Sequence, residues 1–376
     1  MRITHCALLI MKKPYLNSIE YVRGVSMLGV VAIHTGSQYL LSPTPNAHLV
    51  ALFEIASRFS VPIFFFVSAF GLFYRMNLSE PFEYGKFLRR RFKAVLFPYL
   101  LWSTIYVMHD NFFYGYSLLP TPGYAAEILF FGLAKYHLYF MVILIWFYLL
   151  MPLWIFMVKR MTPDKLFLLL ILQVAFDYWS SYSVWLWEYT NSLPESSLLR
   201  MFLQWRLNWL VLHYIFIFIF GGVLGVNSQK FFAWCSSHRN FIVKMFLLSL
   251  IILLGYYYYL PPFKGYTLLD AVNTAHQLSP PGIFYTIAAS IFFFALFQFG
   301  RLPATLKKLL SLLGKNSSFV YLAHPMVITY LVLWMNNRGL IMSSKKALVF
   351  YVATVTITLL ISLIVKKFSS LTPSAR

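Results

Sequence analysis

The chain has 376 residues, of which 60% are hydrophobic, 20% aromatic and only 11% charged. Soluble domains carry about 25% charged residues, so this composition excludes a water-soluble fold of this length. The apolar residues fall in blocks of roughly 18–25 residues, the length that crosses about 30 Å of hydrocarbon as a helix. The composition therefore predicts an all-α, polytopic integral membrane protein.

We expect about ten membrane-spanning helices. In chain order, the predicted spans cover residues 19–41, 49–74, 92–109, 138–158, 165–182, 207–226, 242–260, 281–300, 318–336 and 347–366. The apolar segment 123–134 is too short to span, and we expect an interfacial or re-entrant helix there. No Gly/Ser-rich or Pro-rich linker divides the chain. We therefore expect one transmembrane domain over residues 19–367, between an N-terminal segment (1–18) and a short tail (368–376).

The net charge of +20 does not indicate a nucleic-acid-binding protein, because the basic residues lie between the apolar blocks. They gather on alternate sides, most densely in the segment 75–93. Lys and Arg favour the cytoplasmic side of a membrane protein, so we expect both termini in the cytoplasm. The two cysteines, Cys6 and Cys235, form neither a disulfide framework nor a metal-binding pattern, and no metal is expected.

The first predicted span carries three polar residues, Glu20, Arg23 and His34. Charges in hydrocarbon are costly, and they often mark functional sites. Eleven residues make about three helical turns, so Arg23 and His34 share one face, about 16 Å apart along the axis. A buried imidazole can accept a proton, and a guanidinium suits a phosphate. The simpler alternatives are a snorkelling anchor for Arg23 and a helix–helix hydrogen bond for His34.

Glu20 precedes Arg23 by three residues, close enough to pair with it. Glu54 and Arg58 have the spacing of a structural ion pair on the second span, and Pro62 predicts a kink just after them. Asp177 lies one turn after Gln173 on the fifth span, where it could face a cavity or pack against another helix.

Four stretches resemble the membrane-bound acyltransferase 3 family, which includes bacterial enzymes that O-acylate cell-surface polysaccharides. The first runs from Glu20 through Arg23 to His34. The second runs from Arg58 to Phe70, with Ala69 where the family usually has Gly. The third begins at Arg89-Arg90-Arg91 and includes Lys93. The fourth runs from Gly314 to His324-Pro325. The segment from Tyr136 to Phe140 also fits, and it is most similar to the branch that contains the intercellular-adhesin-locus membrane protein.

The resemblance implies an enzyme that moves an acyl group from acyl-CoA, most simply acetyl-CoA, to a hydroxyl of a polysaccharide or lipid-linked sugar. It implies a location in the bacterial cytoplasmic membrane, in contact with lipid, and leaves a homo-oligomer open. For catalysis, the resemblance implies His34, Arg23 and Glu20. For binding the donor, it implies Arg90, Arg91, Lys93 and Arg58. Glu54, His137, Asp177 and His324 are further polar candidates for the site.

Two other functions fit the same residues. A polysaccharide exporter or flippase could use buried Arg, Glu and His as a polar path, with helices broken at Pro62 and Pro325. It would need no acyl-CoA. The basic segment 89–93 would then only help to orient the chain in the membrane. A non-catalytic membrane subunit would tolerate substitution of both Arg23 and His34.

Overall fold

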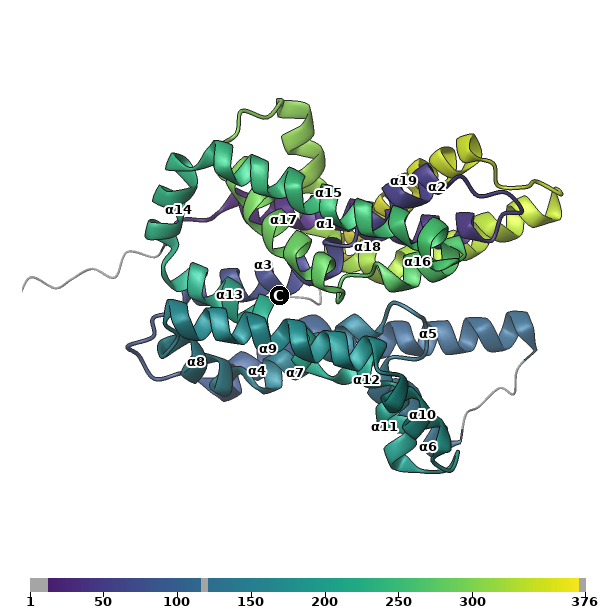
Figure 1. The fold of residues 1–376 in the computed structure, drawn as a ribbon, viewed down its shortest axis with the longest axis horizontal. Coiled ribbons are helices and arrows are strands. Elements are labelled where there is room, and N and C mark those ends of the chain that lie inside the picture. The colour runs from purple at the N-terminus through teal and green to yellow at the C-terminus, as the bar shows by residue number, and fades with distance from the viewer. Residues whose placement is uncertain (1–12, 116–120, 372–376) are drawn as a thin grey trace, which may run out of the picture.

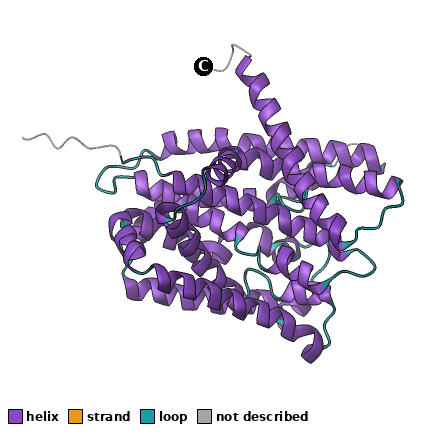
Figure 2. Cartoon of the chain, turned by 90° about the horizontal axis from the view of Figure 1, so that it is seen from above, coloured by secondary structure: helices purple, strands orange, loops and turns teal. Residues whose placement is uncertain are grey.

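The structure is a computed structural model that describes residues 13–115 and 121–371. Within these ranges the chain is helical and contains no strand (Figure 2). The expected all-α class is therefore confirmed. Residues 1–12, with Cys6, and residues 372–376 of the predicted tail lie outside the described part.

The helices are α1 (Asn17–Leu40), α2 (Ala47–Val50), α3 (Ser60–Arg75), α4 (Tyr84–Arg91), α5 (Phe97–Tyr114), α6 (Pro122–Phe131), α7 (Tyr139–Leu149), α8 (Met151–Lys159), α9 (Pro163–Tyr182), α10 (Val184–Ser192), α11 (Leu198–Gln204), α12 (Arg206–Trp209), α13 (Ile215–Val226), α14 (Ser228–Ser237), α15 (Arg239–Lys264), α16 (Leu268–Thr274), α17 (Pro280–Phe299), α18 (Ala304–Asn337) and α19 (Ser344–Leu371). Two π-helical stretches, η1 (Ala51–Ile55) and η2 (Phe92–Leu96), precede α3 and α5, and the 3₁₀ helix η3 (Val211–Tyr214) precedes α13.

Each predicted span falls on one helix or on two or three consecutive helical elements. In the described residues, 5 helices are long and apolar enough to cross a membrane, or up to 8 if each bent pair is one span. The bent pairs are α7 with α8 (65°), α9 with α10 (52°) and α13 with α14 (93°). The chain is thus a multi-pass membrane protein. The total of ten stays a prediction, because it also counts the more polar α1 and α5.

The helix bundle has two ends, which Figure 1 shows at the left and right. Helices α4, α8 and α14 lie at the left end, and α2, α6, α10 to α12 and α16 lie at the right end. Helices α4 and α14 belong to segments expected in the cytoplasm, and α8 forms the end of the fourth predicted span that is expected to face it. Helices α6, α10, α11 and α16 belong to segments expected outside, and α2 and α12 overlap the outer ends of the second and sixth predicted spans. The expected orientation of the chain in its membrane stays a prediction.

Helix α1 packs along α18 at the centre of the bundle. Two glycines allow this close approach. A Cβ atom on Gly24 would overlap the backbone of Leu310, and one on Gly314 would overlap the backbone of Glu20. Small residues at such crossings let membrane helices gain van der Waals contact. The crossing holds the two helices that carry Arg23, His34 and His324.

The second span is irregular before Pro62 rather than after it. Its first part is the π helix η1, followed by a turn over residues 56–59, and α3 then begins at Ser60. Pro62 sits in the first turn of α3, where proline is tolerated. Helix α18, by contrast, runs through Pro325 without interruption, so the break expected there by the exporter hypothesis is not present.

Candidate functional site

A large polar cavity of about 1060 Å³ opens at the end of the bundle where α1 begins. Arg23 lines it, together with Glu20 from the same helix. The other cationic residues of its wall come from three different helices: Arg75 from α3, Arg90 and Arg91 from α4, and Lys159 from α8. The fold thus gathers five cationic side chains around one cavity, two of which the sequence analysis did not select.

The carboxylates of the cavity wall have partners of their own. Glu83 pairs with Lys86 at 2.9 Å, and Glu80 accepts a hydrogen bond from Asn77 at 2.8 Å. The Arg23 guanidinium makes no hydrogen bond or ion pair with any residue in the described ranges; its electrostatic neighbours include Tyr148 and Arg91. The wall holds five cationic side chains and three carboxylates, Glu20, Glu80 and Glu83, so it carries a surplus of positive charge, which suits a polyanionic ligand.

Arg91 is held in place by aromatic rings. Its guanidinium lies 5.4 Å from the ring centroid of Phe87 and 5.3 Å from that of Tyr148. Lys93, two residues further along, lies in η2 with an exposed side chain and is not part of the cavity wall. The basic motif of the sequence is therefore divided, with Arg90 and Arg91 in the cavity and Lys93 outside it.

Glu20 does not form the ion pair expected with Arg23. Its carboxylate is buried and pairs with Lys315 of α18 at 3.6 Å, accepts a hydrogen bond from Ser311 at 2.9 Å, and accepts another from Tyr15. Partial burial, together with the Glu20 hydrogen bond, raises the pKa of the Tyr15 phenol above its ordinary value. Glu20 thus fastens α1 to α18 through Lys315 and Ser311.

His34 lies in a cluster of aromatic and imidazole rings on the same face of α1, further into the bundle. Its ring centroid is 4.7 Å from that of Tyr136 and 5.2 Å from that of His324. The His137 ring lies 5.4 Å from the His324 ring. His34 is partly exposed and Tyr136 is 49% exposed, whereas His137 and His324 are 0% exposed. The structure therefore brings together three histidines that are far apart in the chain.

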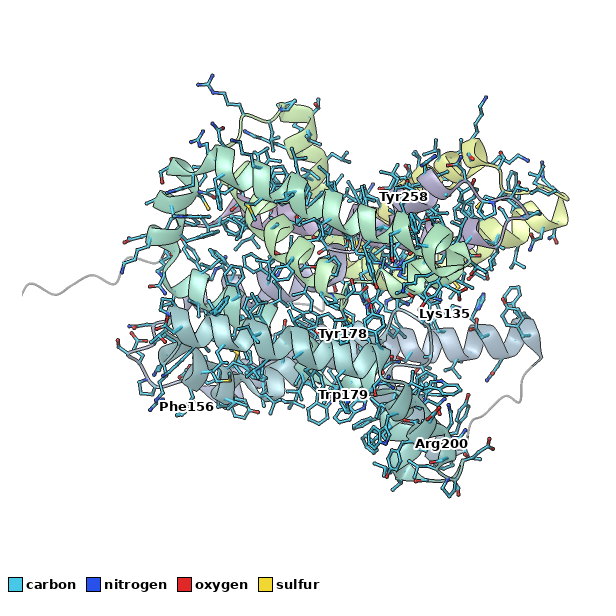
Figure 3. All side chains as sticks on the ribbon, in the orientation of Figure 1. Lys135, Phe156, Tyr178, Trp179, Arg200 and Tyr258 are labelled. Carbon is cyan, nitrogen blue, oxygen red and sulfur yellow. The ribbon has the colours of Figure 1, made fainter. Side chains whose placement is uncertain are left out.

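The turn that carries Tyr136 and His137 is anchored from both sides. Lys135, labelled in Figure 3, binds Asp110 at the end of α5 at 3.0 Å, and the Tyr321 hydroxyl of α18 donates to the His137 carbonyl oxygen. Both ring nitrogens of His137 are buried without a hydrogen-bond partner, and so is Nε2 of His324. This histidine cluster does not have the geometry of a metal site, since the described residues contain no group of three potential ligands that could hold an ion.

Glu54 and Arg58 form the buried ion pair that their spacing predicts, at 3.2 Å. Glu54 also accepts a hydrogen bond from Ser37 of α1 at 2.7 Å, and Arg58 donates to the Val272 carbonyl at 3.2 Å. Arg58 is not part of the basic cavity wall. Its guanidinium is instead held by Glu54 and the Val272 carbonyl, away from the cavity in which the donor was expected to bind.

Asp177 belongs to a separate buried cluster. It binds His213 Nδ1 at 2.6 Å and accepts a hydrogen bond from Gln173 at 2.7 Å, while Gln173 accepts one from the Phe216 backbone at 3.1 Å. The adjoining cavity measures only about 20 Å³, roughly the room that one water molecule needs. Asp177 therefore joins α9 to η3 and α13, which is the packing alternative.

The basic cavity stops short of the histidine cluster. Arg23 and Ser68 belong to its wall, but His34 does not. Between Arg23 and His34, the shared face of α1 carries Met27, Val30 and Val31, each at most 1% exposed. The site thus consists of a basic cavity and a histidine cluster on one helix face, separated by a thin apolar layer.

The helical bundle thus holds a basic cavity and a cluster of imidazoles, and its apolar helices mark it as a membrane protein. Residues 16–367 match the family described as an acyltransferase domain, acyltransferase 3. The chain belongs to this family over nearly its whole length, and it is a membrane acyltransferase. No curated protein and no solved structure matches it.

The sequence analysis missed the contributions of Tyr15, Arg75 and Lys159 to the cavity and of Tyr136 to the histidine cluster. Arg75 is the last residue of α3 and Lys159 is the last residue of α8, both at the basic end of the bundle. Their place at the predicted cytoplasmic ends of two spans was the signal available. Tyr136 lies in a stretch that resembles the family, but its contact with His34 is made across the fold. Tyr15 contacts Glu20, five residues further along the chain, and no sequence pattern marked that contact.

Proposed function

We propose that this enzyme transfers an acyl group, most simply acetyl, from acyl-CoA to a hydroxyl of a cell-surface or exported polysaccharide in the bacterial cytoplasmic membrane. The observation that carries the proposal is the basic cavity of an acyltransferase, with Arg23 on the same helix face as His34. CoA is polyanionic and cytoplasmic, and the cavity lies at the end of the bundle whose loops are richest in Lys and Arg.

Arg23, Arg90 and Arg91 are the groups that would bind the phosphates of the donor. Arginine is suited to this because its planar fork can form two parallel hydrogen bonds to one phosphate. Arg75 and Lys159 add charge from the neighbouring helices. To reach His34, the acyl end of the donor would have to cross the apolar layer of Met27, Val30 and Val31, over the roughly 16 Å that separate Arg23 from His34.

His34 is the group that would act on the acyl transfer itself. It is the partly exposed histidine of the cluster, and a neutral imidazole can take a proton from a hydroxyl or attack a thioester carbonyl. In either role of His34, the reacting acyl carbon would lie close to His324 and Tyr136, whose rings contact that of His34. General base assistance accounts for roughly 10²–10⁴ in rate, so its removal is expected to cost at least this much.

The test is CoA release from acetyl-CoA by purified protein in lipid nanodiscs, for the wild type and His34→Ala. We expect CoA release to fall by about 100-fold or more in His34→Ala. His48→Ala is the matched control, because His48 is an exposed histidine bonded to Tyr258 at 2.9 Å, outside both parts of the site. Wild-type turnover in a folded His34→Ala protein would refute the assignment of His34.

The same experiment separates transfer from export. A polysaccharide exporter without acyl chemistry would neither bind acetyl-CoA nor release CoA. Failure of the wild type to turn over any short acyl-CoA, although correctly folded, would therefore favour the exporter hypothesis. The exporter hypothesis drew on helices broken at Pro62 and Pro325. Because α18 continues through Pro325 without a break, one of these two features is absent.

A further inference from the structure

His324 stands in an unusual environment for a buried histidine. Its ring is stacked on that of His34, with centroids 5.2 Å apart and planes inclined by 25°. It comes from α18, 290 positions away in the chain, and its side chain is completely buried. The Tyr136 ring also contacts His34, and its own side chain is half exposed. Of the two imidazoles, His34 is the partly exposed one, and it lies beside Tyr136.

The backbone of α18 fixes the tautomer of His324. Its Nδ1 lies 3.1 Å from the carbonyl oxygen of Val320. A carbonyl oxygen can only accept, so Nδ1 carries the proton and donates it. In a neutral imidazole the other nitrogen, Nε2, then holds a lone pair. A ring held in this way through Nδ1, with a free basic Nε2, has the arrangement of an oriented general base.

The Nε2 atom of His324 is buried and has no hydrogen-bond partner. Buried polar groups are nearly always paired, and an unpaired one calls for a functional or structural explanation. The buried histidine His213, by contrast, is engaged at both nitrogens, by Asp177 at 2.6 Å and by Ser180 at 3.5 Å. His109 and His137 also have buried ring nitrogens without a partner, but of these three histidines only His324 is stacked on His34.

We propose that His324 is the general base for the acceptor hydroxyl, while His34 carries the acyl group. This inference rests on the proposed function and goes one step beyond it, because it divides the transfer between two imidazoles. His137 is a weaker choice for the same role. Its ring packs against Tyr136, Tyr321 and His324, and it does not stack on His34.

The two half-reactions balance as follows. A ring nitrogen of His34 forms a bond to the thioester carbonyl carbon, the carbon–sulfur bond breaks, and the CoA thiolate takes the proton that the acylated imidazole gives up. The acceptor oxygen then bonds to the acyl carbon as its proton moves to Nε2 of His324. The bond between the acyl carbon and His34 breaks, and the proton passes from His324 to the released His34 nitrogen.

The variant that tests this division is His324→Asn. An asparagine amide nitrogen occupies nearly the position of Nδ1, so it can still donate to the Val320 carbonyl oxygen, but it offers no basic group in place of Nε2. The matched control is His109→Asn. His109 is another histidine with a bonded Nδ1 and a buried, unpaired Nε2, but it lies beside Asp110 on α5.

The assay mixes protein in nanodiscs with acetyl-CoA and follows CoA release, with water as the acceptor. We expect the wild type to give a burst of one CoA per active site, followed by slow turnover as water deacylates the enzyme. In His324→Asn the burst is expected to remain and the turnover to fall by about 100-fold or more. Hydroxylamine, which attacks without prior loss of a proton, is expected to restore turnover and yield acetyl hydroxamate.

The remaining outcomes overturn the inference in distinguishable ways. If His324→Asn loses burst and turnover together, or keeps both, His324 is not the base for the acceptor. If the wild type turns over in a His34-dependent manner but without a burst, the acyl group is not carried on His34, and the proposed function alone survives. If the wild type releases no CoA at all, the proposed function fails as well. His109→Asn is expected to match the wild type throughout.

Discussion

Replacement of Arg91 by alanine is expected to weaken the binding of CoA without slowing the chemical step. A hydrogen bond to a charged group contributes about 1.5–3 kcal/mol, which corresponds to a rise in Kd of roughly 10- to 150-fold. Arg91 should reach the upper part of this range, because its guanidinium is held over Phe87 and Tyr148 at the cavity wall. An already oriented side chain loses less entropy on binding.

Lys93→Ala is the matched control, because it removes the same charge from the same sequence motif. Its side chain is exposed and lies outside the cavity wall, so we expect its effect on Kd to stay within about threefold, in keeping with the small worth of solvent-exposed charge pairs. Isothermal titration of CoA into each variant, at low and high salt, measures both. The difference between the variants should persist at high salt, since screening affects exposed charges more than partly buried ones.

The kinetic parameters give a second, independent measurement. An interaction made equally in the ground state and the transition state changes KM and leaves kcat intact. We therefore expect Arg91→Ala to raise KM for acetyl-CoA at nearly unchanged kcat. Equal effects of Arg91→Ala and Lys93→Ala on Kd would refute the assignment of the cavity as the donor site. A fall in kcat alone would place Arg91 in the chemistry instead.

Two further predictions concern the scaffold. In Gly314→Ala, the new Cβ would overlap the carbonyl oxygen of Glu20, so α1 and α18 must separate by on the order of 1 Å. We expect a clear loss of acyl transfer, because misplacement by about 1 Å costs roughly 100-fold. Gly255→Ala, which meets nothing within 4 Å, should keep full activity. Glu54→Ala leaves the Arg58 charge buried and should lower the free energy of unfolding by about 3–5 kcal/mol, measured by thermal or denaturant unfolding in nanodiscs. Removing Glu83 from its exposed pair with Lys86 should change stability little, and an equal loss in both variants would contradict the buried-pair argument.

The sequence by itself determined the class of protein, the helices and the face that Arg23 shares with His34. These follow from local rules: apolar blocks of spanning length form helices in lipid, and a fixed rotation of 100° per residue decides which side chains share a face. The ion pair of Glu54 with Arg58 followed from the same rule. The acyltransferase family could also be identified at this stage, because its motifs lie in order along the chain.

Only the tertiary structure decided which groups meet across helices. It joined Arg75 and Lys159 to the cavity and left Lys93 outside, it gave Glu20 a partner on α18, and it stacked His324 on His34. The physical reason is that a helix fixes the direction of a side chain only relative to its own axis. Which helix lies opposite depends on how closely two backbones can approach, and here that is decided by glycines at the crossing of α1 and α18.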